Sequence, residues 1–218
     1  MLLSRVADSL YWISRYLERA EHHARVLDVA IDFGLGQPSD SGHRVLERLH
    51  GVLGGQPGED DYDGVLFDGS DRNSVVACVV AARENARQVR EEISSDMWEQ
   101  INALFLRVRQ MQGEASRGAR THFVSKAVVD GIHLFHGITD STMGRGEGWQ
   151  YLQLGRFLER ANATAASART SRTSSPTRPK ACTDARRSTR PNCWRCCAPA
   201  RRSRRTAGTT RPTSARSG

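Results

Sequence analysis

The 218-residue sequence has little of what marks several common protein classes. Aromatic residues make up 6%, and the first 162 residues contain one cysteine, Cys78, within an apolar run typical of a small core residue. The N-terminus has charges inside its apolar stretch and lacks the h-region of a signal peptide. No apolar run is long enough to span a bilayer. These absences predict a soluble cytoplasmic protein that does not enter a membrane.

The sequence also lacks the short motifs of common enzyme classes. It contains no G-x-S-x-G, no Walker phosphate loop and no Cys/His dyad. Three glycines around Arg145 and Glu147 could cradle an anion, but no flanking strand supports a phosphate-loop interpretation. The residues alone therefore name no reaction, and they predict no cofactor.

The last part of the chain lacks the residues of a hydrophobic core. Residues 163–218 contain no Leu, Ile, Val, Met, Phe or Tyr, and their net charge is +13, whereas residues 1–162 carry −5. Such a composition favours disorder, so we expect a helical domain over 1–165 and a disordered basic tail over 166–218. Its residue types are also those of a GC-rich gene translated out of frame, and we interpret the tail as a frameshift product. An arginine-rich arm could also bind nucleic acid, but its arginines lack the interleaved aromatic residues that stack on bases. Cys193-x-x-Cys196 could be half of a zinc knuckle, but the second half is missing. We therefore expect neither nucleic-acid binding nor zinc binding by the tail.

What the sequence does contain is a repeated octet. Residues 14–21 read SRYLERAE and residues 155–162 read GRFLERAN, with five of eight positions identical. On a helix, Arg15 and Arg19 lie one above the other, and Arg156 and Arg160 repeat that layout. Trp12 and Tyr16 lie behind the apolar stripe of the first helix, which predicts a helix covered on both sides and charges that are partly buried. We expect the two octets to face each other and to pair their opposite charges.

Apolar residues recur at three- and four-residue spacing through the first 162 residues, which is typical of helices packed on helices. In the first helix this apolar stripe comprises Leu3, Val6, Leu10, Ile13, Leu17, Ala20, Ala24, Leu27 and Ile31. We expect an all-α antiparallel bundle of five to six helices, with a glycine- and aspartate-rich exposed loop over 55–71. Core candidates of the fifth helix include Phe123, Ile132, Leu134 and Phe135. The expected helices begin near residues 4, 40, 75, 119 and 149. The cluster Asp71-Arg72-Asn73-Ser74 is expected to cap the helical run that starts at residue 75. Within that run, Ser94-Ser95-Asp96 either caps a new helix that continues to Gln112 or kinks the old one.

The arginine–glutamate centre supports two interpretations. The first is a lattice of ion pairs that fixes how two helices cross, because a buried charge must be paired. The second is an arginine-lined pocket for a carboxylate or phosphate, which guanidinium groups bind through two parallel hydrogen bonds. The spacing favours the structural interpretation.

A di-metal centre is a third alternative. Glu47-x-x-His50 resembles one arm of a carboxylate-bridged di-iron bundle. Asp130-x-x-His133 is an imperfect second arm, and His136 follows His133 at i+3. Glu18, Glu21 and His22 could contribute further ligands. Ordinary surface histidines are the more common explanation, so we predict no metal.

Three motifs in this order resemble the bacterial alpha-E domain family, an all-helical domain named for its Glu-Arg motifs. They are the two octets, the run ARENARQVREEISSDMWEQIN, and the segment TMGRGEGWQYLQLGRFLERA. The resemblance covers residues 1 to about 163. Its motif residues in this sequence are Arg15, Glu18, Arg19, Arg83, Glu84, Asn85, Arg145, Glu147, Trp149, Arg156, Glu159 and Arg160.

The resemblance implies a helical bundle without an established catalytic activity. Members of the family occur beside, or fused to, an ATP-grasp-type ligase and transglutaminase-like proteases, which implies a role in a peptide-modifying system. The leading expectation is a non-catalytic helical partner of such a ligase. The alternative is that the centre itself performs amide or peptide chemistry, with Glu18 or Glu159 as the general base. Exposed bundle surface further predicts a homodimer.

Overall fold

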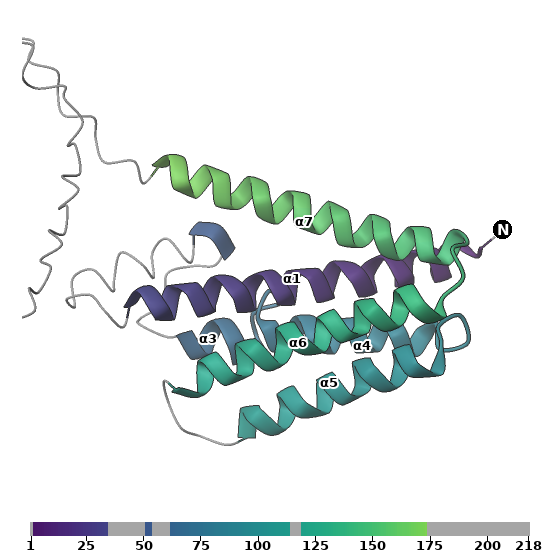
Figure 1. Ribbon diagram of the computed structural model, residues 1–218, viewed down its shortest axis with the longest axis horizontal. Helices are drawn as coiled ribbons and strands as arrows, with labels where there is room; N and C mark the ends of the chain where they lie inside the picture. Colours follow the sequence, from purple (N-terminus) through teal and green to yellow (C-terminus); the bar gives the residue numbers. More distant parts are fainter. Residues whose placement is uncertain (1, 35–50, 54–61, 114–118, 174–218) are drawn as a thin grey trace, which may run out of the picture. The chain divides into compact units, whose positions relative to one another are not determined.

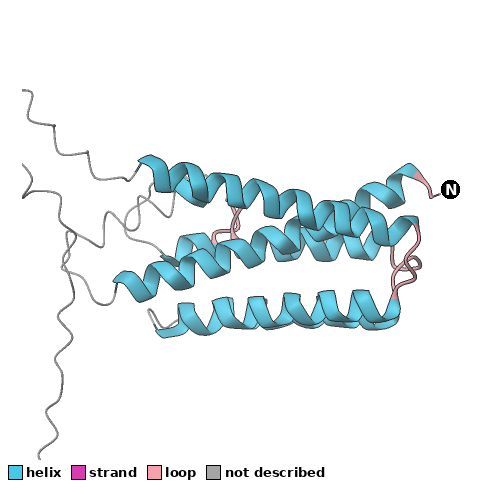
Figure 2. Cartoon of the chain, turned by 45° about the horizontal axis from the view of Figure 1, so that its top comes forward, coloured by secondary structure: helices cyan, strands magenta, loops and turns pink. Residues whose placement is uncertain are grey.

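We describe a computed structural model of the chain over residues 2–34, 51–53, 62–113 and 119–173. All regular structure in these ranges is helical, as predicted (Figures 1 and 2). None of these helices combines the length and the apolar character needed to cross a bilayer. The helices are α1 (Ser4–Gly34), α3 (Tyr62–Phe67), α4 (Val75–Gln88), α5 (Ser95–Gly113), α6 (Ala119–Thr142) and α7 (Glu147–Thr173).

Helix α1 is the central element, because α3, α4, α6 and α7 all pack against it. Along the chain, α1, α4, α5, α6 and α7 alternate in direction, so helices joined by short connections are antiparallel (Figure 1). As a result, α1 and α7 run in the same direction. Because other helices pack against α1 from several sides, the side chains of Trp12 and Tyr16 are only partly exposed, as predicted.

The apolar stripe of α1 forms the centre of the core. The stripe has the predicted three- and four-residue spacing, and it packs with the buried face of α4. Its completely buried side chains are Leu10, Ile13, Leu17, Ala20, Ala24 and Leu27. Cys78 on α4 is fully buried, and burial raises the pKa of its thiol to about 12. Leu3, which the same stripe includes, is 76% exposed because it precedes the first turn of α1.

Several boundaries follow the predicted caps. Ser74 is the N-cap of α4, and its hydroxyl accepts a hydrogen bond from the backbone N–H of Ala77. Ser94 plays the same role for α5, since its hydroxyl accepts from the N–H of Met97 at 3.2 Å. The serine pair therefore starts a new helix rather than kinking the previous one.

Two predictions about the fold are wrong. Residues 62–67, expected to be exposed loop, form α3, because Leu66 is fully buried and holds this turn of helix against the core. In α6, Phe123 is 65% and Leu134 55% exposed. The buried row of α6 includes Val124, Val128, Ile132 and Phe135, and each wrongly predicted residue precedes a member of that row by one position, about 100° around the helix.

Two predicted segments reach the limits of the described ranges. The helix expected over 40–54 is described only at residues 51–53, which are helical. Helix α7 continues past residue 165 to Thr173 through an alanine-rich stretch of high helix propensity. The rest of the predicted tail lies outside the described residues.

Candidate functional site

The two octets lie side by side on α1 and α7, which are in close contact where the octets begin. A Cβ placed on Gly155 would be 2.3 Å from the carbonyl oxygen of Tyr11 and 3.2 Å from the Cβ of Ser14. Gly155 and Ser14 are the first residues of their octets. The small residues therefore set the distance between the helices and put the octets in register.

The second arginine of each octet binds the glutamate of the other octet through two hydrogen bonds. Arg19 donates from Nε to Glu159 Oε1 at 2.8 Å and from Nη2 to Oε2 at 3.2 Å. Arg160 donates from Nε to Glu18 Oε1 at 2.6 Å and from Nη2 to Oε2 at 3.0 Å. The predicted pairing of the octets is confirmed, and it is reciprocal.

Both glutamates of these pairs are buried, with Glu18 5% and Glu159 4% exposed. Burial alone would lower the pKa of Arg19, but its hydrogen bond to Glu159 and the negative charge of that carboxylate raise it. The hydrogen bond to Glu18 is the main reason that the pKa of Arg160 is raised. Each buried carboxylate therefore lies against an arginine whose pKa the contact raises.

The first arginines of the octets break this symmetry. Arg15 lies with its Nε 2.5 Å from Glu159 Oε2, donates from Nη1 to the hydroxyl of Tyr11 at 2.7 Å, and packs over the rings of Tyr11 and Trp12. Arg156 Nε lies 3.7 Å from Glu18 Oε2, beyond hydrogen-bond distance. The α7 residues that correspond to Tyr11 and Trp12 are Leu152 and Gln153, so Arg156 has no hydroxyl partner like Tyr11. Its aromatic contact is with the neighbouring Phe157, 6.0 Å from the ring centroid.

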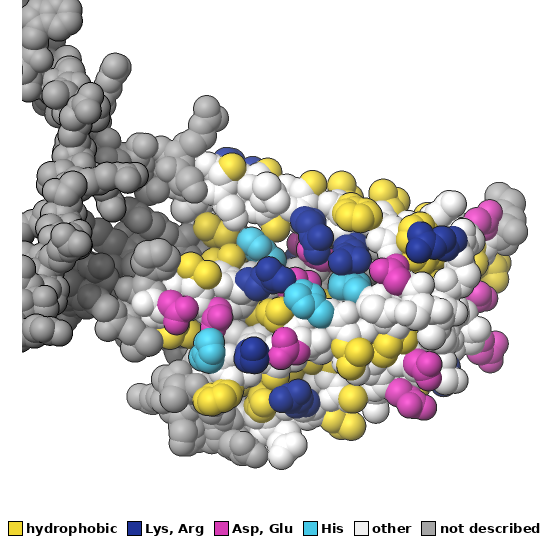
Figure 3. Space-filling model, in the orientation of Figure 1, with side chains coloured by type: hydrophobic (Ala, Val, Ile, Leu, Met, Phe, Trp, Pro, Cys, Tyr) yellow, Lys and Arg dark blue, Asp and Glu magenta, His cyan; other side chains and the backbone are white. Residues whose placement is uncertain are grey.

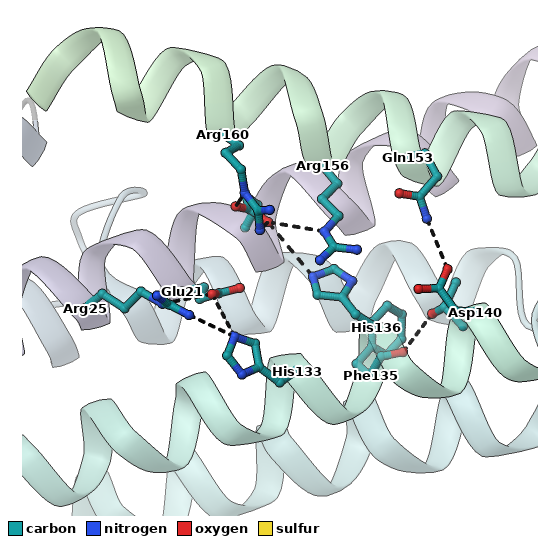
Figure 4. Close-up of polar contacts among 11 residues, drawn as sticks. Glu21, Arg25, His133, Phe135, His136, Asp140, Gln153, Arg156 and Arg160 are labelled. Atoms are coloured by element: carbon teal, nitrogen blue, oxygen red, sulfur yellow. Dashed lines mark hydrogen bonds and ion pairs between the residues drawn. The ribbon is translucent and has the colours of Figure 1, made fainter. Parts of the chain in front are cut away.

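Helix α6 adds two histidines to the centre (Figure 4). His133 Nε2 lies 2.9 Å from Glu21 Oε1, and Arg25 forms an ion pair with the same oxygen, its Nε 2.9 Å away. His136 Nε2 lies 4.0 Å from Glu18 Oε2 and has no hydrogen-bond partner among the described residues. The other oxygen of Glu21, Oε2, is also buried without such a partner.

Three histidines near the centre have lowered pKa values. Burial, followed by the charges of Arg156 and Arg160, lowers the pKa of His136 to about 3. Burial lowers the pKa of His23 to about 4, and its Nδ1 lies 2.8 Å from the carbonyl oxygen of Asn73. Burial likewise lowers the pKa of His22. These histidines are therefore neutral at pH 7.

A cluster with metal-ligand chemistry occurs here, formed by three of the candidate ligands that the sequence offered. Glu18, Glu21 and His136 each offer a ligand atom, and the three atoms lie within 4.8 Å of one another. Asp130 is exposed and is not part of this group. The predicted arm of Glu47 and His50 lies outside the described residues.

The charge balance around this cluster opposes a cation. Five arginines, Arg15, Arg19, Arg25, Arg156 and Arg160, contact three carboxylates, Glu18, Glu21 and Glu159. The excess is two positive charges when the histidines are neutral. At an effective dielectric constant near 20, two unit charges 4 Å apart interact by about 4 kcal/mol. The same positive potential that helps to lower the pKa of His136 would repel a divalent metal ion.

Comparison with known families gives one match. The family model of Alpha-E, a predicted alpha-helical domain with a conserved ER motif, matches residues 2–187. The chain belongs to the Alpha-E family. Searches of curated proteins and of solved structures find no match. In this Alpha-E chain, Glu18-Arg19 and Glu159-Arg160 are the two Glu-Arg dipeptides that pair across α1 and α7.

The other motif residues of this Alpha-E domain lie in two separate places. Arg83 donates to Glu84 and to Asn102, and its guanidinium lies over the ring of Phe105 on α5, 4.6 Å from the centroid. The side-chain amide of Asn85 donates to the backbone carbonyl of Ala81 within α4. These contacts tie α4 to α5 rather than to the octets.

The third motif group joins the ends of α6 and α7. Arg145 lies over the ring of Trp149 at 4.9 Å, and Trp149 Nε1 donates to Asp140 at 3.3 Å. Glu147 accepts a hydrogen bond from the backbone N–H of Leu2 at 2.7 Å. This group holds the start of α7 against α6 and the N-terminus, at a distance along the helices from the octets.

Sequence reasoning missed three members of the centre. Tyr11 supports Arg15 from position i−4, and Arg25 binds Glu21 from position i+4, so helical spacing alone could have indicated both. Asn73 receives a hydrogen bond from Arg19 Nη1 at 3.4 Å across 54 residues of sequence. No local pattern could have indicated that contact.

Proposed function

We propose that this Alpha-E domain is a non-catalytic helical accessory domain. It would act with an ATP-grasp-type ligase and a transglutaminase-like protease in a peptide-modifying system. Membership of the family supports the partnership, because the resemblance implies that such genes occur together. The reciprocal pairing of the octets supports the non-catalytic role, since it uses the Glu-Arg dipeptides to join two helices.

The catalytic alternative has less support from the geometry. A general base must reach a substrate proton within hydrogen-bond distance. Glu18 and Glu159 are at most 5% exposed, and each already accepts two hydrogen bonds from an arginine. A carboxylate held in this way is better suited to tie helices together than to accept a proton.

The exposed apolar surface of α7 also fits a domain that works against another protein. Four large apolar side chains lie on this surface between 38% and 58% exposed, namely Tyr151, Leu154, Phe157 and Leu158.

The proposal places the chain in the cytoplasm, where a ligase has ATP. It also retains the frameshift hypothesis for residues 166–218, which resequencing of the source DNA tests.

The test is coexpression of the chain with an ATP-grasp-type ligase from the same genome. We expect the two proteins to copurify and ATP turnover by the ligase to depend on the chain. The double variant Glu18→Gln/Glu159→Gln should lose cooperative unfolding and ligase binding together, while the control Glu99→Gln, at an exposed position of α5, keeps both.

Two results would contradict this proposal. If the chain does not copurify with the ligase and does not change its ATP turnover, the proposed partnership is wrong. A double variant that folds, binds the ligase and yet abolishes product formation would establish the catalytic alternative.

A further inference from the structure

Arg156 is the one octet arginine whose guanidinium makes no hydrogen bond within the described ranges. Arg19 and Arg160 each make two hydrogen bonds to a glutamate, and Arg15 binds the hydroxyl of Tyr11. The Nε of Arg156 is buried without a hydrogen-bond partner. A guanidinium has five N–H donors, so most of the bonding capacity of Arg156 is unused.

A second unused donor faces Arg156 from α6. Figure 4 shows the guanidinium of Arg156 reaching from α7 toward the imidazole of His136. His136 is 7% exposed, and its Nε2 has no hydrogen-bond partner among the described residues. A neutral imidazole can carry its N–H on Nε2 and donate it. Two buried or half-buried donors from different helices therefore converge.

The surroundings of these donors are positive and open to solvent on one side. The five arginines exceed the three glutamates by two charges. Side chains of Arg156, Arg160 and His133 are 21%, 46% and 50% exposed. Figure 3 shows basic and histidine side chains gathered on this face, with acidic side chains between them. Helices α6 and α7 pack mainly on α1 rather than on each other.

We propose that Arg156 and His136 form a binding site for an oxyanion, a carboxylate or a phosphate, between α6 and α7. Arg156 provides two parallel N–H donors, His136 provides one from the opposite side, and Arg160 adds positive charge while it stays bound to Glu18. The ligand would offset the excess positive charge. Glu18 and Glu159 act as supports that hold the arginines in place.

The site does not depend on the proposed ligase partnership, because it is a property of the isolated chain. If the ligase partnership is contradicted, the anion site can still exist, and the reverse also holds. The unpartnered Glu21 Oε2 is the feature that fits a cation instead, so a metal ion is included among the outcomes of the test.

The experiment titrates the purified chain with inorganic phosphate and with N-acetylglutamate at constant ionic strength, followed by calorimetry and by thermal unfolding. We expect at least one anion to bind and to raise the unfolding temperature. Arg156→Met and His136→Leu should each weaken binding by at least about tenfold, because each removes charge-assisted or directed donors. Arg87→Gln, an exposed arginine of α4, is the matched control and should bind as the wild type does.

The probe that binds more tightly, inorganic phosphate or N-acetylglutamate, shows whether the site prefers a phosphate or a carboxylate. If Arg156→Met does not fold, two other measurements are used instead. One is anion binding by Arg156→Lys, and the other is the NMR signal of the Arg156 Nε–H group in the wild type. The Arg156 signal should move on titration, and the lysine variant should bind more weakly because it lacks the paired donors. Failure of the wild type to bind either anion would overturn the proposal, as would undiminished binding by the Arg156 and His136 variants. Stoichiometric Co²⁺ binding without anion binding would overturn it in favour of a metal site.

Discussion

Gly155 on α7 faces the backbone carbonyl of Tyr11 on α1 so closely that a Cβ there would lie 2.3 Å from the oxygen. Backbone cannot move aside as a flexible side chain can. The two helices must therefore separate if any side chain is introduced at this position. Since the octets begin at this crossing, their ion pairs depend on it.

Gly155→Ala should accordingly destabilise the domain by about 1–3 kcal/mol, as overpacking of a close contact does. Gly137→Ala is the matched control, because it lies within α6 and its added Cβ would meet nothing within 4 Å. The control should be neutral or stabilising by up to about 1 kcal/mol, since alanine favours the helix. Urea unfolding monitored by circular dichroism measures both, and equal stability of the two variants would contradict the close approach.

Glu159→Gln should destabilise the domain more than Glu18→Gln does. The arginines around Glu159 have side chains 15% and 19% exposed, whereas those around Glu18 are 21% and 46% exposed and keep more hydration. Breaking a fully buried pair costs about 3–5 kcal/mol, and we expect about 2–4 kcal/mol here because the arginines are partly exposed.

Glu84→Gln is the control for both substitutions, because its partners Arg83 and Arg87 form an exposed pairing on α4. Its cost should be at most about 1 kcal/mol. The reverse ranking in denaturant unfolding, with Glu84→Gln the most damaging, would mean that the octet pairs do not hold the helices together.

Stability should fall as the pH drops below 6.5, and His23 should account for part of the decrease. Burial lowers the pKa of His23 to about 4 in the folded state, whereas the unfolded histidine titrates near 6.5. Between these values the unfolded state binds the extra proton, so the contribution is full above about pH 6.5 and is lost as pH falls toward 4. The slope is up to about 1.4 kcal/mol per pH unit for one group.

His23→Gln should make this slope shallower while costing some stability at pH 7 through the lost hydrogen bond to Asn73. Unfolding free energies of the wild type and the variant, measured between pH 4 and 8, test this expectation. An unchanged slope would show that His23 does not titrate on unfolding.

The exposed apolar surface of α7 should cause the chain to dimerise. Leu154 and Leu158 are 53% and 47% exposed on neighbouring turns of the same helix. Leu154→Glu/Leu158→Lys should shift the chain toward the monomer without a loss of folding stability, because neither side chain belongs to the core. Analytical ultracentrifugation over a range of protein concentrations measures the shift.

Leu106→Glu is the matched control for that surface, since Leu106 is 57% exposed on α5. It should leave the association unchanged. A wild type that stays monomeric at all concentrations would contradict the prediction, and so would a control that dissociates as readily as the α7 variant.

Local patterns in the sequence were sufficient for the long helices and for the paired octets, but not for the short helix α3. The three- and four-residue spacing in α1 reflects the period of a helix, and it correctly indicated Leu10 to Leu27 as buried. Ser74 marked the start of α4 because capping is a contact between near neighbours. Repetition of the octet indicated that Glu18 and Glu159 would meet arginines across two helices, since buried charges must be paired.

Tertiary structure alone decided which other residues join them. Glu21 meets His133 across 112 residues, and Arg19 meets Asn73 across 54, through the way α4 and α6 rotate against α1. The same rotation exposes Phe123 and buries Val124. Helical periodicity defines a face but not what lies opposite, because that depends on packing between segments far apart in the sequence. For this reason Arg15 and Arg156, equivalent in sequence, have different partners in the fold.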